Sequence, residues 1–267
     1  MQITIINDCL DQNAKLRQIT RTGSLFKNCS VNCFGVKSDL EASGFLVDAI
    51  DAFSGKEGII MANVAPRNKE ANKWKNGTPF GFFWNGKTLI ISSVGGLTLS
   101  LVRKLGTLKD FCILDIAEVL SSINDKKINE NTKKRIINSQ FRSFDFLPMV
   151  ARWIIDGKNI PFSEYDLSKI PKSPNAIWFV DNFGNMKTTL LKEEINLDTE
   201  DNGKLKANGK LIKFKFYNSL GNIPDKTIGL VVGSSGIGGK RFLEIIFRGG
   251  NAGKKLNMKS DFTLELL

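Results

Sequence analysis

The stretch VDNFGNMKTTLL, from Val180 to Leu191, has the pattern of a tight polar turn between two strands. Its turn holds an Asp and two Asn within five residues, with a Phe and a Gly between the two Asn. Other short β-rich runs surround it, with Gly, Asn or Asp between them: AIWFVD, KLIKFKFY, TIGLVVG, RFLEIIF and FTLELL. Runs of this length and spacing predict an all-β domain over residues 175–267, either a sandwich or a barrel.

The first part of the chain alternates strands with helices. ITIIN, CSVNCFG and GIIMANV have the apolar pattern of strands, and a helix is expected after Ser38, which forms a capping-box signature with Glu41. Strands separated by helices predict an α/β domain over residues 1–157, with a mostly parallel sheet and flanking helices. Residues 158–174 hold three of the seven prolines and no periodic pattern, so they predict a linker.

The composition excludes several classes of function. The chain has no histidine, which rules out His-dependent triads and removes the commonest metal ligand. Cys29 and Cys33 lie too far apart along one predicted strand for an easy disulfide, so we expect buried free thiols and no metal site. No window approaches the ~18 consecutive apolar residues of a membrane span. The first residues lack the order of a signal peptide. We therefore expect a soluble cytoplasmic protein with no membrane partner.

The net charge of +11 raises the hypothesis of a nucleic-acid partner. No RNA- or DNA-binding motif accompanies this charge. In one basic cluster, Lys213 and Lys215 alternate with Ile212, Phe214 and Phe216, as in a half-buried strand with a solvated lysine face. Nucleic-acid binding is therefore the minor alternative.

Several shorter stretches each have a structural and a functional interpretation. GSSGIGGKR (233–241) lacks the residue order of a phosphate-binding P-loop and predicts a hairpin loop. In RGGNAGKKL, Asn251 is suited to cap a helix. Asp8 follows the first strand, where it could accept hydrogen bonds from ribose hydroxyls or cap the next helix. Before a late apolar helix, Asp145 could be a cap and Arg142 a surface charge.

In their order along the chain, these features resemble the S-adenosyl-L-methionine (SAM) hydroxide adenosyltransferase family, which includes the fluorinase and chlorinase enzymes. VDNFGNMKTTL is similar to the family's Asp-x-Phe-Gly-Asn motif with following Thr residues. GSSG, RFLEIIF and GGNAGKKLNMKSDFTLEL are similar to its Ser-Ser-Gly, Leu-Glu-Ile and Gly-Asn-Ala ending. ITIINDCL and FRSFDFLPMVA are weaker matches in the first domain.

The resemblance implies a homotrimer that holds SAM between the first domain of one subunit and the second domain of its neighbour. A nucleophile, either hydroxide or halide, would attack the ribose 5′ carbon and expel methionine, with SAM as substrate and no further cofactor. It also implies ligand contacts: Asp8 with the ribose hydroxyls, Asp181 and Ser235 with the methionine amine and carboxylate, and Phe183, Asn185 and Ala252 (through its backbone) around the adenine. Asn251, in the Gly-Asn-Ala stretch, is a further predicted substrate-binding residue.

The catalytic half departs from the family pattern. Asn63 stands where hydrolytic members have an Asp, and Arg142 stands where they have a His; Arg67 could take the place of the family's Arg. The family's Asp-Asn-Gly turn corresponds to SVGG (93–96). A guanidinium stabilises an anion but cannot take a proton at neutral pH.

The sequence therefore predicts an adenosyl-compound binder, with Asn63 and Arg142 as catalytic candidates and displacement at the ribose 5′ carbon as the leading activity. Three outcomes remain open: use of another nucleophile, slow cleavage by positioning alone, or binding without turnover.

Overall fold

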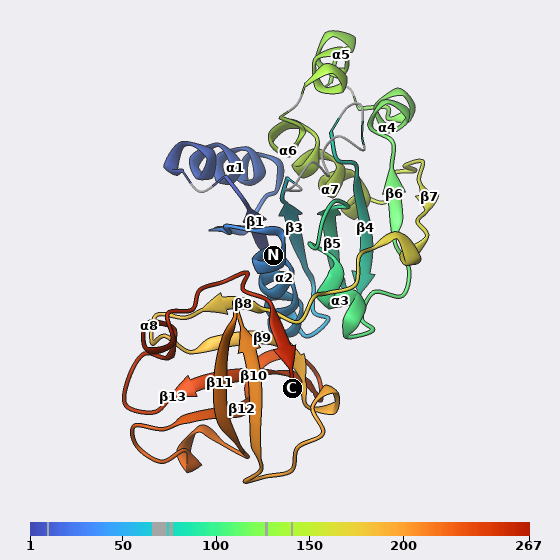
Figure 1. The fold of residues 1–267 in the computed structure, drawn as a ribbon. Coiled ribbons are helices and arrows are strands. Elements are labelled where there is room, and N and C mark those ends of the chain that lie inside the picture. Colours follow the sequence, from blue (N-terminus) through green and yellow to red (C-terminus); the bar gives the residue numbers. More distant parts are fainter. Residues whose placement is uncertain (10, 66–73, 75–76, 126–127, 140) are drawn as a thin grey trace. The chain divides into compact units, whose positions relative to one another are not determined.

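The computed structural model describes residues 1–9, 11–65, 74, 77–125, 128–139 and 141–267. The chain divides into two compact units, Met1–Pro171 and Lys172–Leu267 (Figure 1). The predicted fold class is confirmed, because the first unit contains a sheet with flanking helices and the second is built almost entirely of strands. Within the described ranges, no helix combines the length and the apolar character needed to cross a lipid bilayer.

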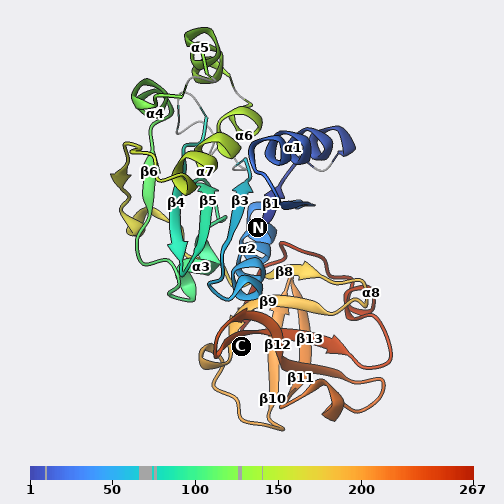
Figure 2. The same cartoon turned by 180° about the vertical axis from the view of Figure 1, so that it is seen from behind.

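A seven-stranded sheet runs through the first unit in the order β2-β1-β3-β5-β4-β6-β7, and Figure 2 shows most of this order across the sheet. Its strands are β1 (Gln2–Asn7), β2 (Ser30–Gly35), β3 (Gly58–Asn63), β4 (Phe80–Asn85), β5 (Thr88–Ser93), β6 (Cys112–Leu114) and β7 (Ser163–Glu164). The first four in spatial order pair in parallel, as predicted. The other three pairings are antiparallel. Only two residues join β4 to β5, and a connection that short permits only antiparallel pairing.

Four helices of the first unit, α1, α2, α4 and α5, begin at side-chain caps that the sequence supplies. Ser38 Oγ accepts a hydrogen bond from the Glu41 backbone N–H (3.1 Å), as the capping-box signature predicts. Asp115 caps α4 in the same way (2.9 Å), which ends β6 earlier than the apolar run suggests. The helices are α1 (Gln12–Leu25), α2 (Asp39–Phe53), α3 (Ser100–Lys104), α4 (Ile116–Ser122), α5 (Glu130–Asn138), α6 (Arg142–Asp145) and α7 (Leu147–Ile155).

The apolar segments of this unit form one core. Every residue of β3 except Asn63 is buried, as expected for a strand covered on both faces. Helix α2 packs on β1 and β3, and α7 packs on β3 and β5. The thiols of Cys29, Cys33 and Cys112 are free and half-buried, whereas Cys9 is exposed.

Part of the proline-rich segment 158–174 contributes to this sheet. β7 pairs with β6, the Tyr165 N–H donates to the Phe111 carbonyl (2.8 Å), and a 3-10 turn follows at Leu167–Lys169. The first compact unit extends to Pro171. No periodic pattern marks these contacts, because the paired strand is only two residues long.

The second unit is a seven-stranded barrel-like sheet in the order β14-β10-β11-β12-β13-β9-β8. Its strands are β8 (Ile177–Val180), β9 (Met186–Leu191), β10 (Asn202–Ala207), β11 (Lys210–Tyr217), β12 (Ile228–Ile237), β13 (Lys240–Phe247) and β14 (Leu264–Leu266). An antiparallel bridge between Ala176 and Thr263 brings the two edge strands together, so the sheet is nearly closed. This geometry decides between the predicted sandwich and barrel in favour of the barrel.

Alternation along β11 fills the barrel interior. Ile212, Phe214 and Phe216 are buried in the core, whereas Lys213 is exposed and Lys215 half-buried, as the pattern predicts. Strands β12 and β13 form the predicted hairpin in place of a P-loop, with Gly238 and Gly239 at its turn. The remaining elements are the short helix α8 (Ala252–Leu256) and 3-10 turns at Lys192–Glu194 and Leu220–Asn222.

Candidate functional site

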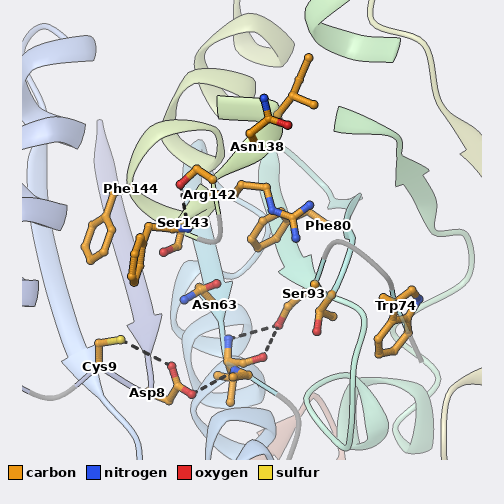
Figure 3. A pocket seen from close by; sticks show the side chains of 17 residues that line it. Asp8, Cys9, Asn63, Trp74, Phe80, Ser93, Asn138, Arg142, Ser143 and Phe144 are labelled. Carbon is orange, nitrogen blue, oxygen red and sulfur yellow. Dashed lines mark hydrogen bonds between the residues drawn. The ribbon is translucent and has the colours of Figure 1, made fainter. Parts of the chain in front are cut away.

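A pocket of about 590 Å³ lies in the first unit at the carboxyl ends of its parallel strands (Figure 3). Asn7 and Asn63 are direct neighbours in the β1–β3 register, so Asp8 follows beside the end of β3. Asp8, Asn63 and Arg142, predicted from three separate stretches, all line this pocket. Ligands of parallel α/β sheets gather at this edge. Arg67 lies outside the described residues.

Asp8 does not cap the following helix. Asp11 caps α1 instead, with its Oδ1 accepting the Ala14 N–H (2.8 Å), so that interpretation of Asp8 is wrong. The Asp8 carboxylate accepts the Ala65 backbone N–H through Oδ2 (3.0 Å), and the Asp8 N–H donates to the Asn63 carbonyl (3.3 Å). Asp8 therefore ties the end of β1 to the segment after β3, at the pocket wall.

Asn63 belongs to a network of amides and hydroxyls. Its Nδ2 donates to Oδ1 of the fully buried Asn7 (3.2 Å). Beside it, Ser93 Oγ accepts the Val64 N–H (3.2 Å) and donates to the Val64 carbonyl (3.0 Å). Neither a carboxamide nor a neutral hydroxyl takes a proton from water at neutral pH, so these groups position the chain end and supply no general base.

Arg142 is not a surface charge, because only 8% of the residue is exposed. Burial lowers the pKa of its guanidinium from the ordinary value. Asp145 does not act as a helix cap either: its carboxylate pairs with Arg21 (3.3 Å) and Arg135 (2.7 Å). Among the residues that the structure describes, none forms a hydrogen bond or ion pair with the Arg142 guanidinium.

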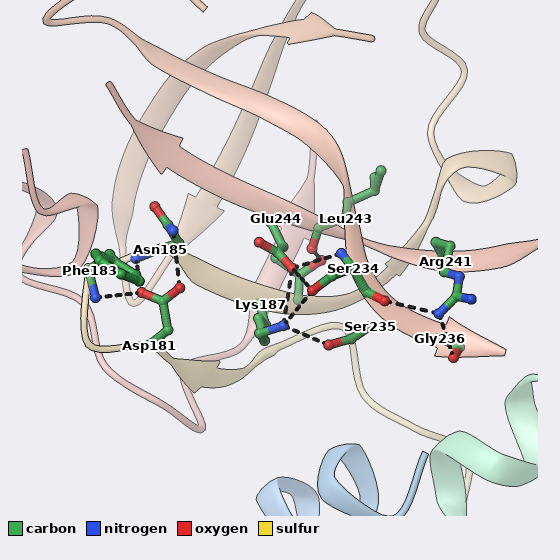
Figure 4. Close-up of polar contacts among 11 residues, drawn as sticks. Asp181, Phe183, Asn185, Lys187, Ser234, Ser235, Gly236, Arg241, Leu243 and Glu244 are labelled. Atoms are coloured by element: carbon green, nitrogen blue, oxygen red, sulfur yellow. Dashed lines mark hydrogen bonds and ion pairs between the residues drawn. The ribbon is translucent and has the colours of Figure 1, made fainter. Parts of the chain in front are cut away.

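In the second unit, the Asp181–Asn185 turn is held by its own aspartate (Figure 4). Oδ1 accepts the backbone N–H of Phe183 (2.9 Å) and of Asn185 (2.8 Å), and Oδ2 accepts Nδ2 of Asn185 (3.0 Å). Three accepted hydrogen bonds fix the conformation of the turn. The Phe183 ring points outward with 71% of the residue exposed, which is unusual for so large an apolar side chain.

The Gly-Asn-Ala stretch packs directly behind this turn. Gly184 has φ +87°, and a Cβ on it would lie 2.0 Å from Cγ of Asn251. The Gly184 carbonyl accepts the Gly253 N–H (3.0 Å), and Asn251 caps α8 as predicted, with Oδ1 accepting the Lys254 N–H (2.7 Å). Two stretches about seventy residues apart in sequence therefore form one unit, with Ala252 fully buried behind it.

A second cavity, of about 580 Å³, opens beside this turn. Asp181, Phe183 and Asn185 line it, together with Lys187 and Glu244. Asn251, Ala252 and Ser235, which are also predicted ligand contacts, are not among its lining residues. Asn251 and Ala252 support the turn from behind, and Ser235 is buried.

Lys187 and Glu244 are site residues that sequence reasoning missed. They face each other across the β9–β13 pairing as an ion pair (3.2 Å), and both side chains are largely buried. Lys187 Nζ also donates to Oγ of Ser234 (3.1 Å) and of Ser235 (2.7 Å). A charged residue inside each of the runs NMKTTLL and RFLEIIF was the available signal, since alternation leaves such residues facing one side of a strand.

The second unit is similar to a known domain family. Residues 175–265 match the family model described as the SAM hydroxide adenosyltransferase C-terminal domain. The match covers about a third of the chain and nearly all of the second unit. The match includes both stretches on which the resemblance rests, the turn at 181–185 and the Gly-Asn-Ala stretch.

Solved structures extend the likeness in fold to the full chain. An uncharacterized conserved protein from Thermotoga maritima is 14% identical with a TM-score of 0.68, and the alignment covers 99% of this chain and 100% of the other. A conserved hypothetical protein from Thermus thermophilus is 13% identical with a TM-score of 0.61, covering 100% and 99% respectively. At such identities the likeness concerns the fold alone. No curated protein matches the sequence.

The match to the SAM hydroxide adenosyltransferase C-terminal domain relates the protein to SAM binding or adenosyl transfer. The cavity of the second unit contains groups suited to different parts of such a ligand: an exposed aromatic ring, a turn carboxylate and a lysine–glutamate pair. Across the described ranges, no three Cys, Asp or Glu side chains are grouped so as to hold a metal ion. The contacts of individual residues with a ligand stay predictions.

Proposed function

We propose that the protein binds SAM, or a closely related adenosyl compound, and transfers the adenosyl group by displacement at the ribose 5′ carbon. The observation that carries the proposal is the packing of the Asp181–Asn185 turn against the Gly-Asn-Ala stretch, within the segment that matches the SAM hydroxide adenosyltransferase C-terminal domain. This packing presents the Phe183 ring at a cavity, and the flat apolar face of an adenine is a natural partner for such a ring.

The proposed chemistry needs little from the protein besides orientation. A lone pair of the nucleophile forms a bond to the 5′ carbon while the bond from that carbon to sulfur breaks. The bonding electrons stay on sulfur, so the sulfonium becomes the neutral thioether of methionine. Because the sulfonium is already a good leaving group, alignment and desolvation of the nucleophile supply most of the acceleration. SAM serves as a substrate in this scheme, and no further cofactor is required.

The identity of the nucleophile depends on proton transfer. Attack by water releases a proton, which the carboxamide of Asn63 and the guanidinium of Arg142 cannot accept at neutral pH. An anion already lacks that proton. These two residues therefore favour an anionic nucleophile over water activated by a general base.

The alternative is an adenosyl-ligand binder without turnover. The replacement of the family's Asp and His by Asn63 and Arg142 also favours this alternative, since Asn63 directs its amide donor to the neighbouring Asn7. We also expect a homotrimer, the assembly that the family resemblance implies, and light scattering on the purified protein tests it. Binding of nucleic acid remains the minor hypothesis, because it has only the net charge in its favour.

One set of incubations separates the hypotheses. The purified protein is mixed with SAM, with and without chloride, and methionine, adenosine and 5′-chloroadenosine are followed by chromatography beside calorimetric titrations. Methionine released together with an adenosine product supports transfer. Binding of SAM without any product supports the hypothesis of an adenosyl-ligand binder without turnover. If neither SAM nor adenosine binds, both are excluded; an affinity for DNA that falls steeply with salt would then favour the third hypothesis.

A matched pair of variants links the result to the proposed cavity. Asp181→Asn replaces a carboxylate oxygen that accepts the Asn185 amide, so the turn loses order and SAM binding should weaken at least tenfold. Asp198→Asn changes the charge equally at an exposed position outside the cavity, and its SAM affinity should match the wild type.

A further inference from the structure

Strand β2 (Ser30–Gly35) forms an open edge of the sheet in the first unit. Among the described strands it pairs with β1 alone, and this register runs through all six of its residues without a break. Half of the backbone N–H and C=O groups of such an edge strand point away from the sheet. Phe34 is 46% exposed, although its ring is large and apolar. β2 therefore presents a row of hydrogen-bonding groups beside an exposed aromatic ring.

The other sheet edges formed by described strands are short or closed. β7 has only two residues. β8 and β14 are joined by the Ala176–Thr263 bridge, next to which the Ile177 N–H donates to the Phe262 carbonyl (2.9 Å). Proteins protect long edges with charged residues, prolines or bulges, because an open edge pairs with other chains. The sequence SVNCFG of β2 contains no charged residue and no proline, and its register has no bulge.

Lysines flank this uncharged strand on both sides. Lys27 precedes β2 and Lys37 follows it, and both are exposed. No described carboxylate forms an ion pair with either side chain within 4.0 Å. The strand spans about 20 Å at the usual rise per residue. β2 thus offers an uncharged pairing surface with a positive charge near each end.

We propose that the edge of β2 binds an extended segment of another protein as an added strand, and that this segment carries Asp or Glu at both ends. Backbone hydrogen bonds would supply the pairing, and side chains of alternate residues would pack on Phe34. Carboxylates at both ends meet Lys27 and Lys37 in whichever direction the segment runs. This surface belongs to the first unit alone and is independent of the proposed adenosyl transfer.

A second copy of this chain fits the edge less well than an acidic segment. Antiparallel self-pairing centred on Asn32 would place Lys27 of each copy opposite Lys37 of the other. Like charges in directly opposed positions destabilise a strand pair. The flanking lysines therefore act in two ways, because they oppose self-pairing and attract a partner with acidic ends.

Fluorescence anisotropy of labelled peptides tests the surface. The probe alternates Val and Thr over the length of β2 and carries two Glu at each end. One control peptide replaces every Glu with Lys. A second control replaces every Val with Pro, which cannot donate a backbone hydrogen bond. The purified full chain should bind the probe saturably and each control at least tenfold more weakly.

Each contrary result overturns a stated part of the proposal. Absence of saturable binding of the glutamate probe, in whatever assembly the purified chain forms, overturns the surface. Equal binding of the proline peptide overturns strand addition, and equal binding of the lysine peptide overturns selection by charge.

A charge-reversed pair of variants links the selection to the two lysines. Lys27→Glu combined with Lys37→Glu should reverse the preference, so that the lysine peptide binds at least tenfold more tightly than the glutamate peptide. Lys204→Glu combined with Lys213→Glu makes the same change in charge at exposed positions of the second unit and should keep the wild-type preference. An unchanged preference in the first double variant, or a reversal in the second, overturns the proposal.

Hydrogen exchange followed by mass spectrometry locates the bound peptide. The amides of β2 should exchange more slowly with the glutamate peptide bound, whereas those of β10 should be unchanged. Protection elsewhere without protection of β2 overturns the assignment to this edge. Light scattering tests the second copy as occupant: self-association of the wild-type chain that the glutamate peptide disrupts, together with protection of β2, would assign the edge to a second copy and overturn the proposed partner.

Discussion

Truncation of one exposed ring provides the sharpest test of the adenosyl cavity. Phe183→Ala removes an aromatic side chain from a residue that is 71% exposed, while the backbone N–H that donates to Asp181 is retained. Folding should therefore change by less than about 0.5 kcal/mol, as for other exposed substitutions. Stacking of a nucleic-acid base on an aromatic ring is worth about 1–3 kcal/mol. The affinity for adenosine should then fall by roughly 5- to 150-fold.

The assay is calorimetric titration of adenosine and SAM, accompanied by thermal melts of each variant. Phe183→Trp keeps a ring and should restore most of the affinity. Leu211→Ala removes an exposed apolar side chain of the same domain outside the cavity and should have no effect on binding. If Phe183→Ala binds adenosine as tightly as the wild type, with an unchanged melting temperature, the ring does not stack on the base and the cavity assignment fails.

Three further outcomes follow from packing, charge and burial. Gly184→Ala should lower the free energy of unfolding in urea by about 2–3 kcal/mol, because Gly184 has a positive φ and a Cβ there would displace Asn251, the cap of α8. Gly209→Ala, also at positive φ but with open space around it, should lower this free energy by only about 1 kcal/mol. Lys187→Met should cost about 3 kcal/mol in the same urea assay by leaving Glu244 unpaired, and adding Glu244→Gln should recover most of it. At pH 8, iodoacetamide should label Cys33 more slowly than free cysteine, because burial raises the pKa of the Cys33 thiol and leaves less of it as thiolate. Mass spectrometry should show that the difference between the two labelling rates is smaller at pH 9.5 than at pH 8.

Local sequence patterns predicted the fold, because most helices and strands of both units are marked by residues that lie close together in the sequence. The helix cap at Ser38 and the alternation along β11 each involve neighbours in sequence, and both are found in the structure as predicted. The closure of the barrel was not predictable to the same degree. It depends on a bridge between Ala176 and Thr263, residues far apart along the chain whose own sequences carry no mark of the pairing.

The candidate site was predictable only where the residue type itself indicates a chemical role. Asp8, Asn63 and Arg142 come from three separate stretches, and their common pocket follows from strand order and from the position of α6. The ion-pair partner of each charged side chain could not be predicted from the sequence. Whether Arg142 is paired depends on where the Asp145 carboxylate points, and it points toward Arg21 and Arg135.

Lys187, Glu244 and Asp181, which line the second unit's cavity, are each paired, so the salt dependence of binding tests how its ligand is held. In the second unit, Lys187 and Glu244 neutralise each other and the turn amides satisfy Asp181, so a neutral adenosine would bind mainly through stacking. Added salt screens charges and leaves stacking of a neutral base largely unaffected. Adenosine affinity that stays flat over a chloride titration would support stacking on Phe183, whereas an affinity that falls steeply with chloride would contradict it.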